Sequence, residues 1–411
     1  MAGTISTFSY KVRDKSGTIR SGEIDGSSTD AVLSSLRARG FTPIQVERKK
    51  RSALNAEIKI PGWSNRVKGK DVVLFSRQFA TMVNAGLSLI RSLNVLAQQV
   101  ESKTLADVIT KVKSDVEQGL SLSAAMEKHP KVFGDLYVAM VKAGEVGGVL
   151  DETLNRLADI LEANMALKSK IKSAMAYPAV VGFLIIAVTT AMIVFVVPVF
   201  TNLYNELGSG ASLPLPTQVL VGISKAMTGF WWLIIIAVVG GTFGFRRWKR
   251  TEAGRTAWDA IKLRVPVFGT LAHKTALSRF SRTLAVLSRT GVPILQAIDI
   301  VSDTAGNRVM ARALEDVKAS VREGEAIADP LNRHKIFPPM VVQMMTVGEE
   351  TGALDDMLEK VASFYDREVD ATVSALTSLI EPILIVVMGV TVGGILIALY
   401  LPIFNIAGLV T

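Results

Sequence analysis

Three long stretches without a charged side chain constrain the fold of this 411-residue chain more than any other feature. They lie between Lys172 and Glu206, between Lys225 and Arg246, and after Glu381, and they contain 33, 20 and 30 residues. A helix needs roughly 20 mainly apolar residues to cross a bilayer. We therefore predict a mainly α-helical, polytopic membrane protein, with transmembrane helices at 173–203, 226–245 and 379–404.

The distribution of Lys and Arg beside these stretches predicts the topology. Lys168, Lys170 and Lys172 precede the first stretch and RRWKR at 246–250 follows the second, whereas the loop between them holds only Lys225. Cytoplasmic loops are enriched in Lys and Arg, and the first 30 residues contain no apolar segment typical of a signal peptide. We expect the N-terminus in the cytoplasm, an external loop at 204–225 and an external C-terminal tail at 405–411.

An internal duplication organises the chain. The segment that begins FSRQFATMVNAGLSL at Phe75 aligns with FSRTLAVLSRTGVPI at Phe280, and FVVPVF ending at Phe200 aligns with LYLPIF ending at Phe404. Each copy consists of a cytoplasmic unit followed by one span, and apolar residues in each unit recur with helical spacing. We predict two homologous cytoplasmic helical bundles, at 71–172 and 246–378, with five or six short helices each.

The N-terminal residues have a different pattern. FSYKVRD, TIRSGEIDG and FTPIQVE alternate as strands do, and SSTDAVLSSLRARG has the capping residues of a helix. We therefore predict a small α+β module at residues 1–47. The basic, aperiodic segment 48–70 reads as a linker that contacts anionic headgroups.

The repeated element GE-x-x-G-x-LD is the most specific local signal. It supplies the candidate structural or partner-interface residues Gly144, Glu145, Gly148 and Asp151, and in the second copy Gly348, Glu349, Gly352 and Asp355. The acids could bind a cation or face a basic partner. In the alternative that we favour, the glycines end one helix in left-handed backbone, expected at Gly144 and Gly348, and the aspartates stabilise the first turn of the next helix. The element would then be a joint that sets the angle between each bundle and its membrane helix.

The motifs of catalysis are missing from the sequence. It has no cysteine, its three histidines are far apart, and it contains no phosphate loop or dinucleotide fingerprint. We expect no catalytic residue, cofactor or metal site, and no enzyme activity. Basic residues interleaved with acids predict no binding of nucleic acid.

Small residues four apart in the spans, such as Gly389 and Gly393, permit helices to approach closely, so we expect a homo-oligomer. An oligomeric transporter or channel is the rival class. It is disfavoured because three spans with few internal polar residues offer no pathway within one chain.

Taken in order, LFSRQFATMVNAGLSL, YVAMVKAGEVGGVLDETLNRLA, KSAMAYPAVV, FVVPVF and their second copies resemble the inner-membrane platform proteins of type IV pilus and type II secretion machines, the PilC/GspF family. The resemblance covers Phe8 to Phe404 and is nearer to the pilus branch. It implies a scaffold in the bacterial inner membrane, with a periplasmic C-terminus, that couples a cytoplasmic hexameric ATPase to pilin insertion or extraction. Other inner-membrane pilus alignment proteins are further implied partners, and a type II secretion platform is the alternative.

Overall fold

A computed structural model describes residues 6–13, 19–26, 29–38, 40–48, 67–206, 213–266 and 268–407. Most of the predicted linker (49–66), part of the predicted external loop (207–212) and the end of the predicted tail (408–411) lie outside these residues. The chain divides into two compact units, Met1–Arg66 and Val67–Thr411.

The first unit is the predicted α+β module. Strands β1 (Ser6–Arg13), β2 (Ile19–Gly26) and β3 (Thr42–Arg48) form an antiparallel sheet in the order β2-β1-β3, and α1 spans Thr29–Ala38. Phe8 and Val12 of β1 alternate with exposed residues and pack against Val32 and Leu36 of α1. This small core confirms the sequence prediction for the module.

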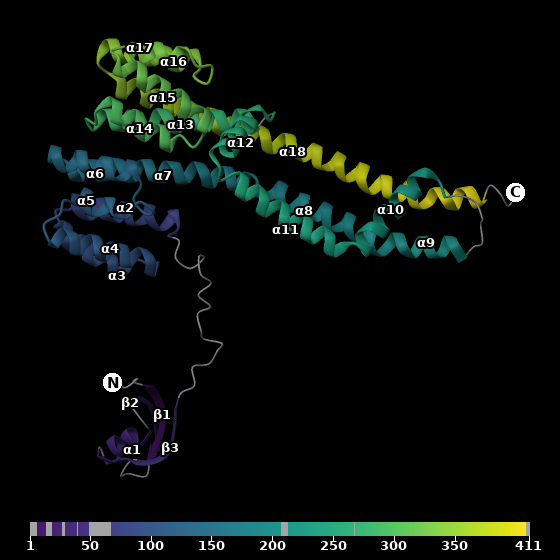
Figure 1. Ribbon diagram of the computed structural model, residues 1–411, viewed down its shortest axis with the longest axis horizontal. Helices are drawn as coiled ribbons and strands as arrows, with labels where there is room; N and C mark the ends of the chain where they lie inside the picture. The colour runs from purple at the N-terminus through teal and green to yellow at the C-terminus, as the bar shows by residue number, and fades with distance from the viewer. Residues whose placement is uncertain are drawn as a thin grey trace. The chain divides into compact units, whose positions relative to one another are not determined.

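The second unit contains both copies of the repeat (Figure 1). The first bundle comprises α2 (Gly69–Asn84), α3 (Leu89–Gln99), α4 (Lys103–Glu117), α5 (Leu122–Glu127), α6 (Asp135–Gly147) and α7 (Leu150–Ala174). The second comprises α12 (Glu252–Arg264), α13 (Phe268–Arg289), α14 (Ile294–Thr304), α15 (Arg308–Arg322), α16 (Ala328–Asn332), α17 (Pro339–Thr351) and α18 (Leu354–Ala407). Helices α13 to α18 repeat α2 to α7 in order, which confirms the duplicated helical fold.

In each bundle the first repeated helix packs along the long last helix, α2 on α7 and α13 on α18. Phe75 and its counterpart Phe280 are almost completely buried in these contacts. An ion pair is duplicated with them: Arg77 Nε donates to Glu162 over 2.7 Å, and Arg282 pairs with Asp366 at the equivalent positions. The two copies therefore have the same order of helices, the same buried phenylalanine and an equivalent ion pair between the first and last helices.

Among the described residues, two helices are long and apolar enough to cross a membrane. One extends from Leu150 to Leu203 through α7, α8 (Ala176–Ala191), the π-helix η2 (Met192–Val196) and α9 (Val197–Glu206). The other lies in α18, from Leu354 to Pro402. Their apolar side chains are widely exposed, as expected of residues that face lipid.

The predicted second span is not one straight helix. It is built from α10 (Leu215–Gly229) and α11 (Trp231–Trp248), which meet at Phe230 with a bend of 78° and together form at most a third span. Helix α10 also begins inside the segment predicted as a loop, because Pro216 occupies its first turn, a position where proline favours helix initiation.

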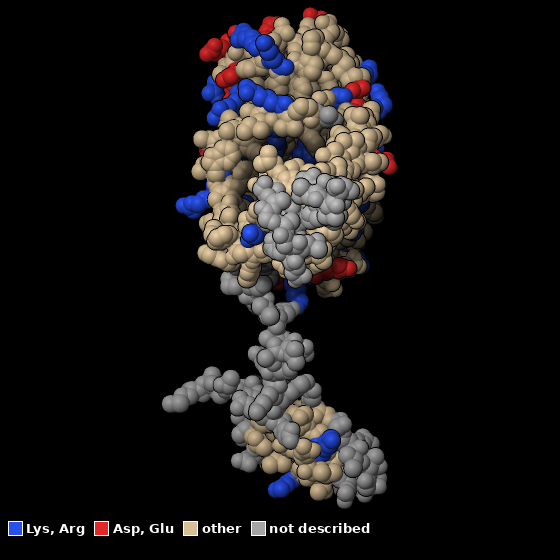
Figure 2. All heavy atoms as spheres, turned by 90° about the vertical axis from the view of Figure 1, so that its right-hand side faces the viewer, with Lys and Arg blue, Asp and Glu red and all other residues tan. Residues whose placement is uncertain are grey.

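Helix α10 packs on both long membrane helices. Thr217 Oγ1 donates a hydrogen bond to the carbonyl of Ala398 in α18 over 2.5 Å, and Ser224 Oγ donates to the carbonyl of Ile193 in η2 over 2.7 Å. Figure 2 looks toward the end where α9 and α18 finish; the described surface there is largely uncharged, whereas Lys, Arg, Asp and Glu gather at the top, over the second bundle.

Candidate functional site

The two GE-x-x-G-x-LD elements form the same turn in both copies. Gly148 ends α6 with φ of 69°, and Gly352 ends α17 with φ of 68°. The following residue, Val149 or Ala353, donates its N–H to the carbonyl of Gly144 or Gly348 over 3.0 and 2.9 Å. Left-handed backbone with this back-bonding is a common way to end a helix, so each turn redirects the chain directly into a long helix.

The expected left-handed backbone at Gly144 and Gly348 is wrong. Both glycines lie inside helices, α6 and α17, and both are buried. A Cβ atom on Gly144 would lie 2.9 Å from Cβ of Thr153, and one on Gly348 would lie 2.8 Å from Cα of Leu354. These positions hold glycine because the next helix crosses too closely for any side chain.

Glu145 and Glu349 are fixed by backbone hydrogen bonds. Glu145 accepts from the N–H groups of Leu122 and Ser123, over 2.5 and 3.1 Å, and from the Ser123 hydroxyl. Glu349 accepts from the N–H groups at positions 327 and 328, over 2.7 and 3.1 Å. Each carboxylate thus satisfies otherwise unpaired N–H groups at the start of a short helix, α5 or α16, and ties that helix to the turn.

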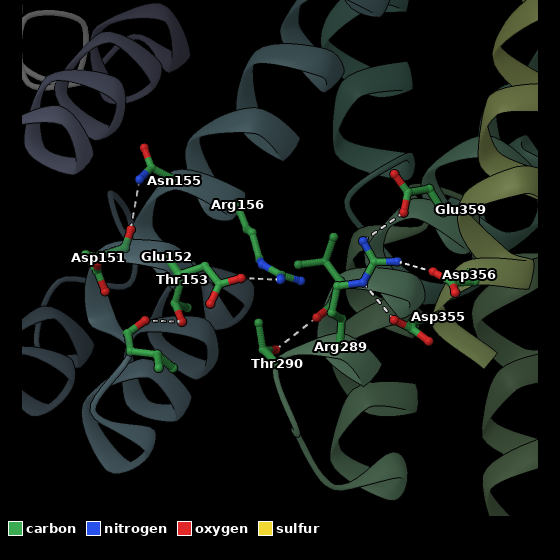
Figure 3. Close-up of polar contacts among 12 residues, drawn as sticks. Asp151, Glu152, Thr153, Asn155, Arg156, Arg289, Thr290, Asp355, Asp356 and Glu359 are labelled. Carbon is green, nitrogen blue, oxygen red and sulfur yellow. Dashed lines mark hydrogen bonds and ion pairs between the residues drawn. The ribbon is translucent and has the colours of Figure 1, made fainter. Parts of the chain in front are cut away.

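In the second copy the turn is held by one arginine from α13 (Figure 3). The Arg289 guanidinium contacts Asp355 over 2.7 Å, Asp356 over 2.6 Å and Glu359 over 2.8 Å, all in the first turns of α18. The hydrogen bond from Arg289 holds the pKa of Asp355 below its ordinary value, and the same bond raises the pKa of Arg289. Asp355 therefore stays ionised to a lower pH than an aspartate without this partner.

The first copy lacks this clamp. Asn84 stands where the repeat offset would place the counterpart of Arg289, and Asp151 and Glu152 are exposed at the start of α7. Glu152 pairs instead with Arg156, one turn along the same helix. The structure places Asp151 and Asp355 at equivalent positions, but only Asp355 has a cationic partner among the described residues.

A cavity of about 190 Å³ lies between the two bundles beside these turns. Arg156, Asp159 and Ile160 of α7 line one side, and Arg289 and Glu359 belong to the other. Figure 3 shows Arg156 and Arg289 between the two groups of acids. The bundles also touch through α6 and α14 and through α7, α13 and α18, so the turns lie beside the contact between the two repeats.

The described contacts of the Glu145 and Glu349 carboxylates are hydrogen bonds from N–H and O–H groups. No group of three or more His, Asp or Glu side chains that could hold a metal ion occurs within 67–206, 213–266 and 268–407 or the described part of the N-terminal unit. The oxygens of Glu145 and Glu349 already accept N–H groups. The contact of Arg289 with the acids of the second turn was not predicted from the sequence. The signal available for it was that the equivalent residue in the first copy is Asn84.

Comparisons with known proteins agree with this architecture. The family described as "Type II secretion system (T2SS), protein F" matches residues 75–198 and again 280–402, and "Type II secretion system protein F, N-terminal domain" matches 1–47. The chain is 45% identical over 401 residues to the type IV pilus assembly protein PilC of Myxococcus xanthus, covering 98% of this chain and 95% of that protein. PilC of Thermus thermophilus is 41% identical, with 98% of each chain covered. The type II secretion system protein F of Pseudomonas aeruginosa is 32% identical, with 99% and 100% covered.

Proposed function

Because the chain belongs to the type II secretion system protein F family, whose members include type IV pilus assembly proteins, we propose that it is the platform protein of a type IV pilus machine in the bacterial inner membrane. Full-length identities of 45% and 41% to two PilC proteins, against 32% to a secretion protein F, support the pilus assignment. A type II secretion platform is the alternative within the same family.

One structural observation carries the mechanical part of the proposal: each bundle continues into a helix of 54 residues that reaches the apolar segment. At 1.5 Å per residue such a helix is about 80 Å long. A small change in angle at the turn before Leu150 or Leu354 therefore becomes a large displacement at the far end. The repeated turns are proposed as the joints of this scaffold.

The energy for such a motion would come from a partner. The sequence contains no phosphate loop, so we propose that the bundles contact a cytoplasmic hexameric ATPase and couple its cycle to pilin insertion or extraction. The N-terminus would lie in the cytoplasm and the C-terminus in the periplasm. Other inner-membrane pilus alignment proteins, and further copies of this chain, complete the proposed set of partners.

The purified full-length chain tests the coupling. Added to the pilus ATPase of the same organism, it should co-purify with the enzyme and change its rate of ATP hydrolysis, while the chain alone hydrolyses no ATP. Hydrolysis by the chain alone would overturn the scaffold role. Deletion of its gene should abolish pili and leave protein secretion intact, whereas the reverse result would assign the chain to a secretion system.

Reporter fusions test the topology. Fusions after Lys172 and at Arg250 should report the cytoplasm, because both follow the basic segments. Fusions near Ser209 and after Thr411 should report the periplasm. A cytoplasmic C-terminus would exclude three spans and leave α10 and α11 as a membrane-embedded hairpin.

A further inference from the structure

The junction between α11 and α12 concentrates positive charge where an apolar helix ends. All residues of α11 are exposed and none from Trp231 to Phe245 is charged, so the side chains of this segment face lipid. Four basic residues follow within five positions: Arg246, Arg247, Lys249 and Arg250. This junction therefore lies at the depth of the lipid headgroups.

The cluster is organised around the indole of Trp258 in α12. Phe245 packs edge-on against this ring, with 4.9 Å between ring centres. The ammonium groups of Lys249 and Lys262 lie 5.7 and 5.9 Å from the ring centre. One cation directly follows α11 and the other lies in α12, and the shared aromatic ring holds the two ammonium groups near each other.

The negative charge available to this cluster is small. Asp259 is 5% exposed; one of its oxygens accepts from Lys262 over 3.0 Å and the other from the N–H of Arg308 over 3.2 Å. Lys249 has no carboxylate partner in the part of the chain that the structure describes. The spare positive charge of the cluster is therefore that of Lys249, and the indole ring of Trp258 holds it close to Lys262.

We propose that Lys249, Lys262 and Trp258 form a binding site for the phosphate of an anionic phospholipid headgroup. A phosphate diester supplies the negative charge that Lys249 lacks, and its oxygens accept hydrogen bonds from the lysine ammonium groups. The lipid, rather than free phosphate, is favoured because exposed Phe245 and Trp248 continue the site toward the acyl chains. The site would fix the depth and rotation of α11 in the membrane.

Native mass spectrometry of the full-length protein tests the site. The protein in a neutral detergent is titrated with phosphatidylglycerol or with phosphatidylcholine of the same acyl chains, and retained lipid is counted. Phosphatidylglycerol should be preferred, and the variant Lys249→Gln/Lys262→Gln should lose the preference by about tenfold. The matched control Lys335→Gln/Lys360→Gln removes two exposed charges from the second bundle and should keep the preference for phosphatidylglycerol.

Further measurements distinguish the effect of charge from a failure to fold, and a lipid phosphate from free phosphate. The variant Lys249→Arg/Lys262→Arg should retain the lipid, and Trp258→Phe, which weakens the contact of the ring with both cations, should retain less. Unfolding temperatures measured without added lipid identify any variant that fails to fold. Equal lipid retention by wild type and the Gln pair would overturn the proposal. So would inorganic phosphate that displaces phosphatidylglycerol when sodium chloride of equal ionic strength does not, because that result assigns the site to free anions.

Discussion

Gly148 and Gly352 have backbone angles that a branched side chain strongly disfavours. Their φ values of 69° and 68° lie in the left-handed region, and no other atom occupies the space where a Cβ would project. Gly148→Val and Gly352→Val should therefore destabilise the protein by backbone strain alone, by about 1 to 2 kcal/mol each. Thermal unfolding of the detergent-solubilised chain measures this loss.

Gly69→Ala is the control for these two variants. Gly69 lies at the start of α2, where φ is negative and the Cβ space is equally open. The substitution should leave the unfolding temperature unchanged or raise it slightly. If Gly148→Val were as harmless as Gly69→Ala, the turn would be able to relax, and its role as a fixed joint would be wrong.

Substitutions at Glu145 and Glu349 should act through lost hydrogen bonds rather than backbone strain, because both carboxylates accept hydrogen bonds from backbone N–H groups. Gln in place of Glu145 keeps one oxygen but turns an NH₂ group toward N–H groups that need an acceptor. Leaving one such group unsatisfied costs about 1 to 3 kcal/mol. Glu145→Gln and Glu349→Gln should each lower the unfolding temperature, and added divalent cations should change neither wild type nor variants. A cation-dependent rise in stability that is lost in the Gln variants would restore the cation-binding interpretation.

Among the elements, the start of α18 is held electrostatically, and its stability should depend on pH. The pKa of Asp355 is lowered in the folded protein by Arg289, so its stabilising contribution is present above the unfolded pKa of about 3.9 and is lost as the pH falls through the folded value. Arg289→Gln should cost roughly 1 kcal/mol at pH 7.

The difference in unfolding temperature between wild type and Arg289→Gln should then shrink as the pH falls toward 3. Asp151→Asn is the matched control in the first copy, where no arginine of the described chain contacts the carboxylate, and it should change stability little at either pH. A difference that stays constant with pH would mean that Arg289 acts through packing rather than charge.

Helix α10 joins the membrane helices through two hydroxyl groups. Thr217 and Ser224 are buried, and each donates to a carbonyl in a different long helix. Hydrogen bonds between membrane helices contribute about 0.6 kcal/mol on average and up to about 1.7. Thr217→Val and Ser224→Ala should lower the unfolding temperature, and Thr228→Ala, whose hydroxyl bonds only within α10, should lower it less. Equal effects of all three would argue against a clamping role.

Features of the fold that depend on residues close along the chain can be predicted from the sequence. The helical bundles and the long apolar helices follow from spacing and hydropathy, because each depends on residues close along the chain. The duplication follows from comparing one half of the sequence with the other. The bend at Phe230 and the contact between Arg289 and Asp355 do not follow, since both depend on packing between distant segments. The misplaced left-handed backbone at Gly144 has the same cause: a close helix crossing and a turn both select glycine, and only the structure distinguishes them.

For the whole molecule, the relation between the two repeats can be tested by cross-linking. Lys170 of α7 and Asp370 of α18 form an ion pair of 2.5 Å, and the chain has no cysteine of its own. In a Lys170→Cys/Asp370→Cys variant, a short membrane-permeant thiol cross-linker should join the two long helices. If the repeats move relative to each other during assembly, cross-linked cells should lose pili. The single-cysteine variants treated alike should keep them, and normal piliation at complete cross-linking would contradict relative motion.

The two long helices differ in how continuously they are wound. Helix α18 continues without interruption from Leu354 to Ala407, whereas its counterpart is interrupted at Met175 and wound as a π-helix from Met192 to Val196. An unbroken α-helix transmits torque along its axis, and a π-helical turn is a place where the winding is already altered. If the bundles turn relative to the membrane, we therefore expect more of the change in winding to fall at Met175 and Met192–Val196 of the first copy than in α18.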